Sequence, residues 1–391
     1  MAAAPDPGPL PVLEAPGTPL DGVPVPPVER ADLLLVRLPF VAPFSISSAT
    51  WTCKEALVLR VEAEGAVGWG ECVADPDPFY APETTTSARH VLAEFLLPLL
   101  EPGQTFLELD ARFARVRGNR MAKATVENAL VDLAAKRAGV PLHELLGAGR
   151  KRVPSGISIG LQESPQALVR EVASAVARGY HRVKVKVKKG KDVDYVAAVR
   201  ERYPDLPLMA DANGDYRLED AGHLARLDAF GLTMIEQPLS YADLYEHSLL
   251  QRRLATPLCL DESVHDLADL RAAIDLGGCR VLNLKQGRVG GLLESIRLLR
   301  HAASRAVPVW SGGMDETGIG RAVNIHLQTV DGFTLPGDTS ETSRYFHEDL
   351  VEPPVVLDAD GFVEVPRGAG IGVEVVAERL GRFTLRSERL R

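Results

Sequence analysis

The segment RVKVKVKKGKDVDYVAAVRERYPDLPLMADANG (182–214) contains two short apolar runs, and each ends in an ionisable side chain, Lys186 in the first and Asp211 in the second. A polar turn and a stretch with helical apolar spacing separate the two runs. The same unit recurs along the chain, and its successive charged positions are 25, 25, 25 and 24 residues apart, with the later ones at Glu236, Asp261 and Lys285. A strand, a loop and a helix repeated at this interval are typical of a parallel β/α array.

The repeat predicts an α/β fold, a (β/α)8-type barrel of the modified TIM kind, over residues 151–337. Its strands are expected at 156–160, 181–187, 207–213, 233–238, 257–262, 280–285, 307–313 and, with the weakest pattern, 332–337. The C-terminal ends of the strands in such a barrel converge on one mouth. We therefore expect the three carboxylates and at least two lysines to surround one pocket.

The rest of the chain is expected to form an α+β capping domain. Residues 30–150 show strand patterns first and helical patterns after them, and Gly139 is placed to end a helix. Residues 338–391 do not continue the repeat, and a hairpin at 355–366 is expected to return to the capping domain. The capping domain is thus predicted to combine the N-terminal part with the C-terminal segment.

Three further stretches are irregular. Residues 1–29 are rich in Pro, Ala and Gly and are expected to form a disordered tail. The stretches 41–51 and 71–84 carry aromatic residues among Pro, Ser and Asp. They are interpreted either as surface loops or as lids that close over a site built elsewhere.

The composition restricts the possible partners. A net charge of −9 without a long basic run argues against nucleic acid, and no run of 18 apolar residues is present to span a membrane. The N-terminus does not have the pattern of a signal peptide. The four cysteines form no Cys-x-x-Cys pair, which fits a reduced compartment; they are Cys53, Cys72, Cys259 and Cys279. We expect a cytoplasmic protein that binds a small molecule.

The carboxylates at three successive strand ends predict a metal site. Parallel strands lie about 4.8 Å apart, so the oxygens of Asp211, Glu236 and Asp261 can surround one cation. Without a cation they would repel one another and raise their own pKa values. Ligation by oxygen alone suits Mg²⁺ or Mn²⁺. The alternative, that each acid is a helix cap or a salt-bridge partner, explains one such residue better than three at equal spacing.

The lysines predict proton transfer. Lys184 and Lys186 share one face of the second strand, because side chains alternate along a strand, whereas Lys188 lies beyond it in a solvated turn. Lys285 ends the sixth strand, on the opposite side of an eight-stranded ring. A divalent cation lowers the pKa of a nearby lysine and makes a neutral amine available as a base. This arrangement favours removal of a proton α to a carboxylate, through a metal-stabilised enediolate.

With these residues in place, the chain resembles the enolase superfamily, within it the muconate-lactonising subgroup, and there the o-succinylbenzoate synthase / N-acylamino acid racemase family. The resemblance runs from about residue 30 to the end. It is carried, in order, by LPFVAPF, GWGECV, NRMAKATVENALVDL, RVKVKV, DAN, IEQPL, LDES, NLKQGRVGG, GGMDETGIGRA and TLPGDTS. Lysine or histidine bases beside Mg²⁺ are typical of that superfamily.

The resemblance implies a role for each matching residue. Lys186 and Lys285 would be opposed acid/bases, and Lys184 would assist Lys186. The ligands of Mg²⁺ (or Mn²⁺ or Co²⁺) would be Asp211, Glu236 and Asp261. A small-molecule carboxylate substrate would contact Phe44 in the first lid, Ser158, Asn213, Ser311, Gly312, Gly313 and Met314. A homo-oligomer, from dimer to octamer, is implied as well.

The chain departs from the family pattern in places. It has Gln286 where Pro is common, Ser311 where Cys is common, and Asp315 where an aliphatic residue or Glu is common. None of these removes a catalytic group, and the last two bear on the identity of the substrate. The strand-seven histidine of the mandelate racemase subgroup is absent, because that strand ends in Trp310-Ser311-Gly312. His265 falls on a turn and His301 and His326 fall on helices, where surface or packing roles are expected.

Several activities therefore stay open. The preferred one is N-acylamino acid racemisation, with an N-succinylamino acid as the substrate, because the lid aromatics and the GGM segment look closest to that branch. The alternative is o-succinylbenzoate synthase, a dehydration in menaquinone biosynthesis, followed by dipeptide epimerase. A Schiff-base aldolase that uses Lys285 and a non-enzymatic barrel are remote alternatives.

Overall fold

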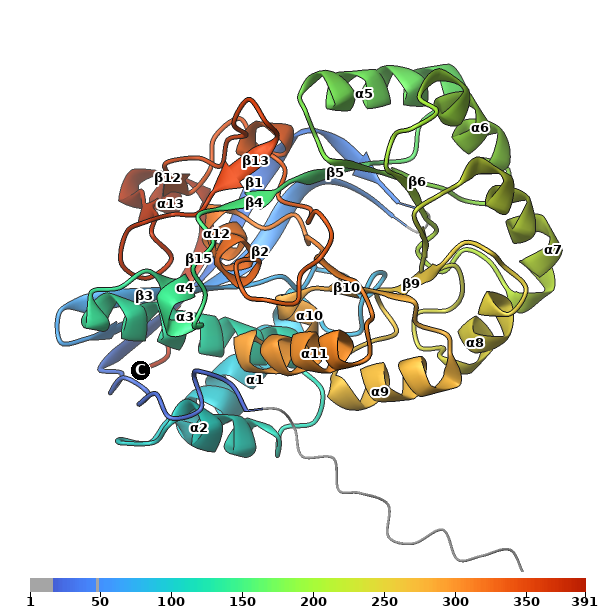
Figure 1. Cartoon of the computed structure of the whole chain (residues 1–391). Helices are drawn as coiled ribbons and strands as arrows, with labels where there is room; N and C mark the ends of the chain where they lie inside the picture. The colour runs from blue at the N-terminus through green and yellow to red at the C-terminus, as the bar shows by residue number, and fades with distance from the viewer. Residues whose placement is uncertain (1–16, 47–48) are drawn as a thin grey trace, which may run out of the picture.

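A curved parallel sheet forms the centre of the computed structural model, which describes residues 17–46 and 49–391 (Figure 1). The sheet has seven strands among these residues, in the order β11-β10-β9-β8-β7-β6-β5. The strands are β5 (Gly156–Ile159), β6 (Arg182–Lys186), β7 (Leu208–Asp211), β8 (Ile235–Glu236), β9 (Leu258–Leu260), β10 (Val281–Leu284) and β11 (Val309–Ser311). Every neighbouring pair is parallel. The predicted barrel and its parallel array are confirmed.

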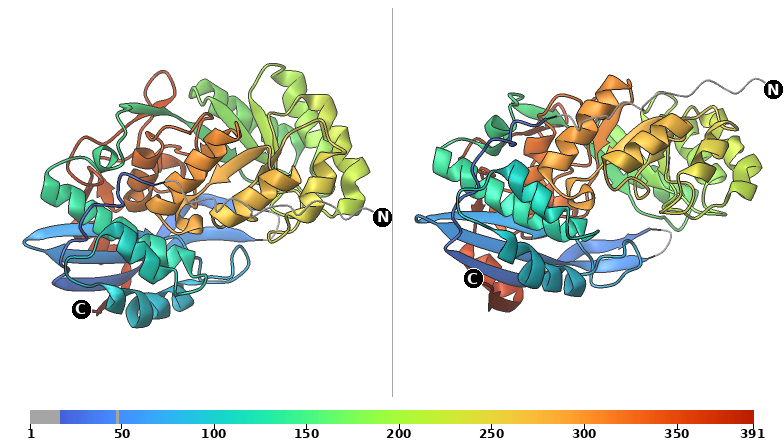
Figure 2. Two further views of the ribbon diagram at one scale, coloured as in Figure 1. Left: turned by 60° about the horizontal axis from the view of Figure 1, so that its bottom comes forward. Right: turned by 90° about the horizontal axis from the view of Figure 1, so that it is seen from below.

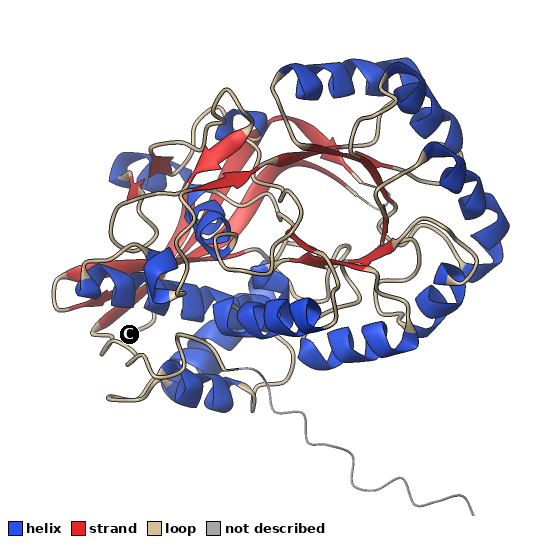
Figure 3. Cartoon of the chain, viewed as in Figure 1, coloured by secondary structure: helices blue, strands red, loops and turns tan. Residues whose placement is uncertain are grey.

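Helices cover the outer side of this sheet (Figure 3). They are α5 (Pro165–Ala177), α6 (Val193–Arg202), α7 (Ala221–Leu224), α8 (Tyr245–Gln251), α9 (Leu267–Leu276), α10 (Gln286–Val289), α11 (Leu292–Ser304) and α12 (Gly318–Leu327). The stretch 218–230, with its regular apolar spacing, is not one helix. It divides into α7 and a 3₁₀ turn on each side, and Gly222 lowers the helix propensity at its middle.

The eighth strand of the prediction, 332–337, is not a regular strand. It lies between β11 and β5, with single parallel bridges from Phe333 to Val309 and from Gly337 to Ser155. The Gly156 N–H donates to the Gly337 carbonyl, at 2.7 Å. Because Pro336 has no N–H to donate, a continuous ladder cannot form, and the ring closes through isolated hydrogen bonds.

The capping domain contains an antiparallel sheet with the order β15-β1-β2-β3. Its strands are β1 (Arg30–Ser45), β2 (Thr50–Ala63), β3 (Ala66–Cys72) and β15 (Thr384–Arg389). The accompanying helices are α1 (Thr85–Val91), α2 (Phe106–Phe113), α3 (Arg120–Ala138) and α4 (Leu142–Leu145). Figure 2 shows this sheet beside the barrel, with α1, α2 and α3 next to it. Gly139 ends α3 in the left-handed conformation, with φ of 70°, as predicted.

Close contact between β3 and α3 depends on two glycines. A Cβ atom at Gly68 would lie 2.2 Å from the Ala129 carbonyl oxygen, and one at Gly70 would lie 2.1 Å from that of Thr125. Only glycine permits this approach of helix and strand. The apolar core of the cap continues without a break into the β9–β11 side of the barrel. This shared core fixes the position of the cap relative to the barrel.

The stretch 41–51 differs from the expected loop. Much of it extends β1 and β2 as a hairpin, in which Phe44 pairs with Trp51 and Ser45 with Thr50 after a break in register that begins at Pro39. The stretch 71–84 begins as the end of β3 and continues without regular structure to α1.

The expected disordered tail, residues 1–29, falls partly on described residues. Residues 1–16 lie outside the described part of the chain. Residues 17–29 differ from the expectation, because Leu20, Val25 and Val28 are buried in the cap core and the Val25 N–H donates to the carbonyl of Gln104, at 2.8 Å. Proline-rich composition therefore does not prevent packing here, since buried apolar side chains and backbone hydrogen bonds hold the segment against the cap.

The C-terminal segment contains β12 (Val351–Glu352), β13 (Phe362–Glu364), β14 (Glu374–Val375) and α13 (Ala377–Phe383) before β15. The hairpin expected at 355–366 does not join the cap. Its strand β13 pairs with β4 (Arg152–Pro154), just before β5. The segment reaches the cap through β15, which pairs with β1. None of the helices in the described part of the chain is long and apolar enough to cross a membrane.

Candidate active site

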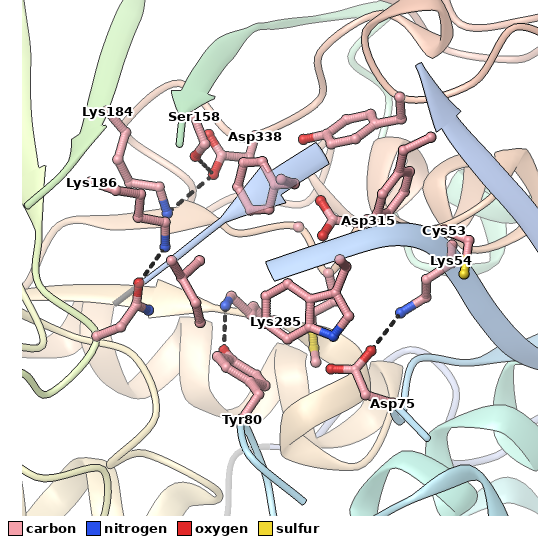
Figure 4. Close-up of a pocket in the computed structure, with 18 residues that line it drawn as sticks. Cys53, Lys54, Asp75, Tyr80, Ser158, Lys184, Lys186, Lys285, Asp315 and Asp338 are labelled. Carbon is pink, nitrogen blue, oxygen red and sulfur yellow. Dashed lines mark hydrogen bonds and ion pairs between the residues drawn. The ribbon is translucent and has the colours of Figure 1, made fainter. Parts of the chain in front are cut away.

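A pocket lies where the C-terminal ends of the barrel strands meet the capping domain (Figure 4). From the barrel it is lined by the lysines of β6, by Lys285 after β10 and by the segment that follows β11. From the cap it is lined by the β1–β2 hairpin and the 73–84 segment. The lining residues are Phe40, Phe44, Ile46, Trp51, Cys53, Lys54, Asp75, Tyr80, Ser158, Lys184, Lys186, Asn213, Lys285, Gly313, Met314, Asp315, Asp338 and Tyr345.

The three predicted metal ligands lie beneath this pocket, and all are fully buried. Asp211 and Glu236 are direct partners across β7 and β8, and Asp261 follows β9. Asn283 of β10 donates to Glu236 Oε1 at 2.6 Å and fixes that carboxylate from the side. The spacing of the repeat therefore places these acids on adjacent strand ends, as predicted.

Lys184 forms ion pairs with two of these carboxylates and with a third buried acid, Asp338. Its Nζ lies 3.1 Å from Glu236 Oε2, 3.2 Å from Asp211 Oδ2 and 3.3 Å from Asp338 Oδ2. The ammonium also lies 4.7 Å from the centre of the Trp310 ring. Burial alone would lower the pKa of Lys184, but the three carboxylates outweigh it and raise that pKa.

The other two lysines enter the pocket from separate strands. Lys186 Nζ donates to Asp211 Oδ2 at 2.6 Å and to Asn213 Oδ1 at 2.7 Å. Lys285 Nζ donates to Asp261 Oδ2 at 2.8 Å and to the Tyr80 hydroxyl at 2.6 Å. Three strands, β7 to β9, separate β6 from β10. The two amines therefore reach the same pocket from different sides.

The protein groups favour charged lysines. Burial would lower the pKa of Lys285, yet Tyr80, Glu262 and Glu236 raise it above the ordinary lysine value. The pKa of Glu236 is raised, first by burial and then by the neighbouring Asp211. A lysine must be neutral before it can accept a proton, so its pKa has to fall. A cation bound by the carboxylates would neutralise part of their negative charge and lower that pKa.

The donor set fits a hard divalent cation in its chemistry. Asp211, Glu236 and Asp261 offer only oxygen, on adjacent strand ends, as Mg²⁺ prefers. Each is engaged by protein cations, and Arg288 pairs with Asp261 in addition to Lys285. Within residues 17–46 and 49–391, no three His, Cys, Asp or Glu side chains lie close enough together to hold a metal ion in this arrangement. A cation bound by these oxygens would compete with the lysine and arginine partners for the same carboxylates.

The other predicted contact residues divide into two groups. Five of them line the pocket, namely Phe44, Ser158, Asn213, Gly313 and Met314. Ser311 and Gly312 do not line it. They lie below, where a Cβ atom at Gly312 would be 2.2 Å from Asn283 Oδ1, so the role of Gly312 is to leave room for the residue that holds Glu236.

Sequence reasoning missed several residues of the site. Asp338, in the motif TLPGDTS, pairs with Arg182 and Lys184 and accepts a hydrogen bond from Ser158 at 2.7 Å. It follows the eighth segment, so the strand-end rule that found Asp211 could have found it. Lys54 and Tyr80 come from the cap. Tyr80 lies in the 71–84 stretch that is interpreted as a possible lid, but the sequence does not single out either residue.

Comparison with known proteins places the chain in a family. Residues 167–379 match the family described as "Enolase C-terminal domain-like", and residues 31–147 match "Mandelate racemase / muconate lactonizing enzyme, N-terminal domain". A protein of Geobacillus kaustophilus named o-succinylbenzoate synthase is 47% identical over 360 residues, which cover 91% of this chain and 96% of that protein.

Two further relatives support the same placement. A protein of Thermus thermophilus named N-succinylamino acid racemase is 44% identical, and the match covers 92% of this chain and 97% of the relative. The crystal structure of an enolase superfamily member from Listeria innocua is similar with a TM-score of 0.90 at 39% identity, and covers 93% of this chain and 99% of that one. The chain therefore belongs to the enolase superfamily, among the enzymes named o-succinylbenzoate synthase and N-succinylamino acid racemase.

Proposed function

We propose that this enzyme removes the proton α to the carboxylate of a small acid, through an enediolate, and that its substrate is an N-succinylamino acid, which it racemises. The observation that carries the proposal is the approach of two lysine amines to one pocket, from β6 and from the end of β10, above three buried carboxylates. A Mg²⁺ ion (or Mn²⁺ or Co²⁺) held by Asp211, Glu236 and Asp261 would supply positive charge that stabilises the enediolate.

The remaining steps belong to the side chains of the pocket. Lys186 takes the α-proton from one face of the substrate, and Lys285 returns a proton to the other face, which inverts the α-carbon. The reverse assignment serves the other enantiomer. Lys184 stays charged beside Glu236 and Asp338 and adds to the positive field. The aromatic wall of Phe40, Phe44 and Trp51 limits the access of water to the reacting carbon.

Racemisation is preferred over dehydration because both lysines are held by a second acceptor besides a carboxylate. The Asn213 amide oxygen holds Lys186 at 2.7 Å and the Tyr80 hydroxyl holds Lys285 at 2.6 Å. Two oriented amines suit two proton transfers. The second candidate is o-succinylbenzoate synthase, in which Lys186 alone would act as acid and base. The Geobacillus relative with that name supports it. A dipeptide epimerase is third.

A Schiff-base aldolase fits less well. Schiff-base formation on Lys285 does not need a metal site, whereas three carboxylates of the type that binds a metal are buried beneath the pocket and argue against this chemistry. Treatment with borohydride and a carbonyl substrate would trap Lys285 if this chemistry occurred.

The test is exchange of the α-proton in D₂O with Mg²⁺ present, using N-succinyl-L-phenylglycine or N-succinyl-L-methionine while the optical rotation is followed. We expect exchange together with loss of rotation, both abolished by EDTA. Loss of the racemisation in Lys186→Ala and in Lys285→Ala would establish two-base chemistry. Lys189→Ala is the matched control, since Lys189 is exposed and paired with Asp220, outside the pocket.

Two other results would change the assignment. If no amino-acid derivative exchanged, but the cyclohexadiene precursor were dehydrated to o-succinylbenzoate, the enzyme would be a synthase. If Lys285→Met retained that dehydration while Lys186→Met lost it, Lys186 would be the only base. Failure of both reactions in the presence of Mg²⁺ would contradict the proposed function.

A further inference from the structure

Tyr80 of the capping domain reaches across to a lysine of the barrel (Figure 4). Its hydroxyl accepts a hydrogen bond from Lys285 Nζ at 2.6 Å, and it donates to Asp261 Oδ2 at 3.4 Å. The ammonium lies 5.0 Å from the centre of the tyrosine ring. Tyr80 belongs to the irregular segment between β3 and α1. One side chain of the cap thus touches the amine that ends β10.

The two opposed lysines differ in this respect. The hydrogen-bond acceptors of Lys186 are Asp211 and Asn213, both from the barrel. Lys285 has one acceptor from the barrel, Asp261, and one from the cap, Tyr80. Because Asp261 is an expected metal ligand, a bound cation would compete for its oxygens. Tyr80 is then the neighbour that continues to fix the Lys285 amine.

Tyr80 also lines two cavities. One is the candidate active site, and the other is an outer cavity bounded by Pro82, Gly118, Met121 and Tyr241. The phenol side chain therefore borders both cavities, with its hydroxyl in contact with the lysine amine. This position limits the directions that the long Lys285 side chain can take.

We propose that Tyr80 is a positioning residue for Lys285, which holds this amine toward one face of the substrate and has no corresponding effect on Lys186. The inference rests on the proposed function, because it needs two lysines that act on opposite faces. A lysine side chain has four rotatable bonds. A fixed acceptor for its amine restricts their conformations in advance, so less conformational entropy is lost when the proton is transferred.

The test compares the two faces of one substrate within one protein. Deuterium exchange is measured by NMR, with Mg²⁺, for the D and the L enantiomer of N-succinylmethionine separately. Lys285→Ala and Lys186→Ala first identify which enantiomer presents its proton to which lysine. Tyr80→Phe, which removes only the hydroxyl, is then made alone and in each of these two backgrounds. Tyr241→Phe is the matched control, since Tyr241 borders the outer cavity and is half exposed.

We expect Tyr80→Phe to slow exchange of the enantiomer facing Lys285 by about tenfold, as expected for one hydrogen bond to a charged group, and to change the other less than twofold. The effect should persist in Lys186→Ala and vanish in Lys285→Ala. Equal slowing of both faces, with an unchanged thermal midpoint, would make Tyr80 a general lid and overturn the proposal, as would no slowing of either. Absence of exchange in the unmutated enzyme would overturn the proposed function itself.

Discussion

Glu71 at the end of β3 and Thr317 at the start of α12 are joined by two hydrogen bonds, from the threonine N–H at 3.0 Å and from its hydroxyl at 2.6 Å. The Gly320 N–H is a third donor, at 2.9 Å. The carboxylate therefore fastens the capping sheet to a helix of the barrel. Burial nevertheless raises the pKa of Glu71 to about 7, because it outweighs these donors.

This pKa predicts how stability depends on pH. The folded-state value lies above the ordinary value of 4.5, so the native state binds the proton more tightly than the unfolded state. The contribution of Glu71 is fully present below about pH 4.5 and is lost as the pH rises through about 7, on the order of 3 kcal/mol in total.

Glu71→Gln should remove this dependence, because the amide stays neutral. At pH 5 we expect the variant to be less stable than the parent, because its NH₂ group faces the Gly320 N–H. Between pH 5 and pH 8 the parent loses stability and the variant does not, so the difference in unfolding free energy should shift in favour of the variant. Urea unfolding at several pH values measures the difference. Parallel curves for the two proteins would contradict the assigned pKa.

Lys184→Met should destabilise the metal-free protein. The change leaves Glu236 with Asn283 as its remaining polar partner among the described hydrogen bonds, and an uncompensated buried charge costs about 3 kcal/mol. Thermal unfolding in EDTA measures this loss. Added Mg²⁺ should restore more stability to Lys184→Met than to the parent. An unchanged midpoint in EDTA would contradict the role of Lys184 as the counter-charge of these carboxylates, and no gain from Mg²⁺ in either protein would count against the metal site; Lys189→Met serves as the exposed control.

Gly312→Ala should disturb the floor of the site. The new Cβ would lie 2.2 Å from Asn283 Oδ1 and 2.8 Å from Lys285 Cε, so both side chains have to move. We expect a loss of α-proton exchange of about 100-fold, as a displacement of this size commonly produces. Gly222→Ala, where nothing lies within 4 Å of the added atom, is the control. Retained exchange in Gly312→Ala would show that the floor can adjust.

Asp315 should influence the choice of substrate. It lines the pocket and adopts a left-handed conformation with φ of 54°, which asparagine also tolerates. Asp315→Asn therefore removes the charge with little strain. We expect the ratio of kcat/KM for N-succinyl-L-methionine to that for N-succinyl-L-lysine to rise about tenfold, because an apolar group no longer desolvates a carboxylate. An unchanged ratio would place Asp315 outside the specificity pocket.

The barrel and its charged mouth could be predicted because the repeat is local. Each of Lys186, Asp211, Glu236, Asp261 and Lys285 follows its own apolar strand, so spacing alone brings them to one edge. The eighth segment follows the same spacing but does not form a regular strand, since Pro336 has no N–H to donate to the ladder. Regular spacing predicts position better than it predicts hydrogen bonding.

The cap stretches 41–51 and 71–84 could be interpreted as lids, but the individual contacts between cap and barrel could not be predicted. Tyr80 and Lys285 are 205 residues apart, and no periodicity relates them. Phe44 was expected in a lid, yet the pairing of Phe44 with Trp51 in an extended hairpin depends on a register break within β1. The burial of Leu20 likewise depends on a partner surface formed elsewhere in the chain. Composition alone suggested disorder there.

The pairing of β15 with β1 imposes an order on biosynthesis. Residues 384–389 are translated after every strand of the barrel, so the barrel can assemble on the ribosome while β1 still has an open edge. An open edge strand is a site for pairing with other chains. Translation that stops before Thr384 would therefore leave the outer edge of β1 unpaired and free to pair with another chain.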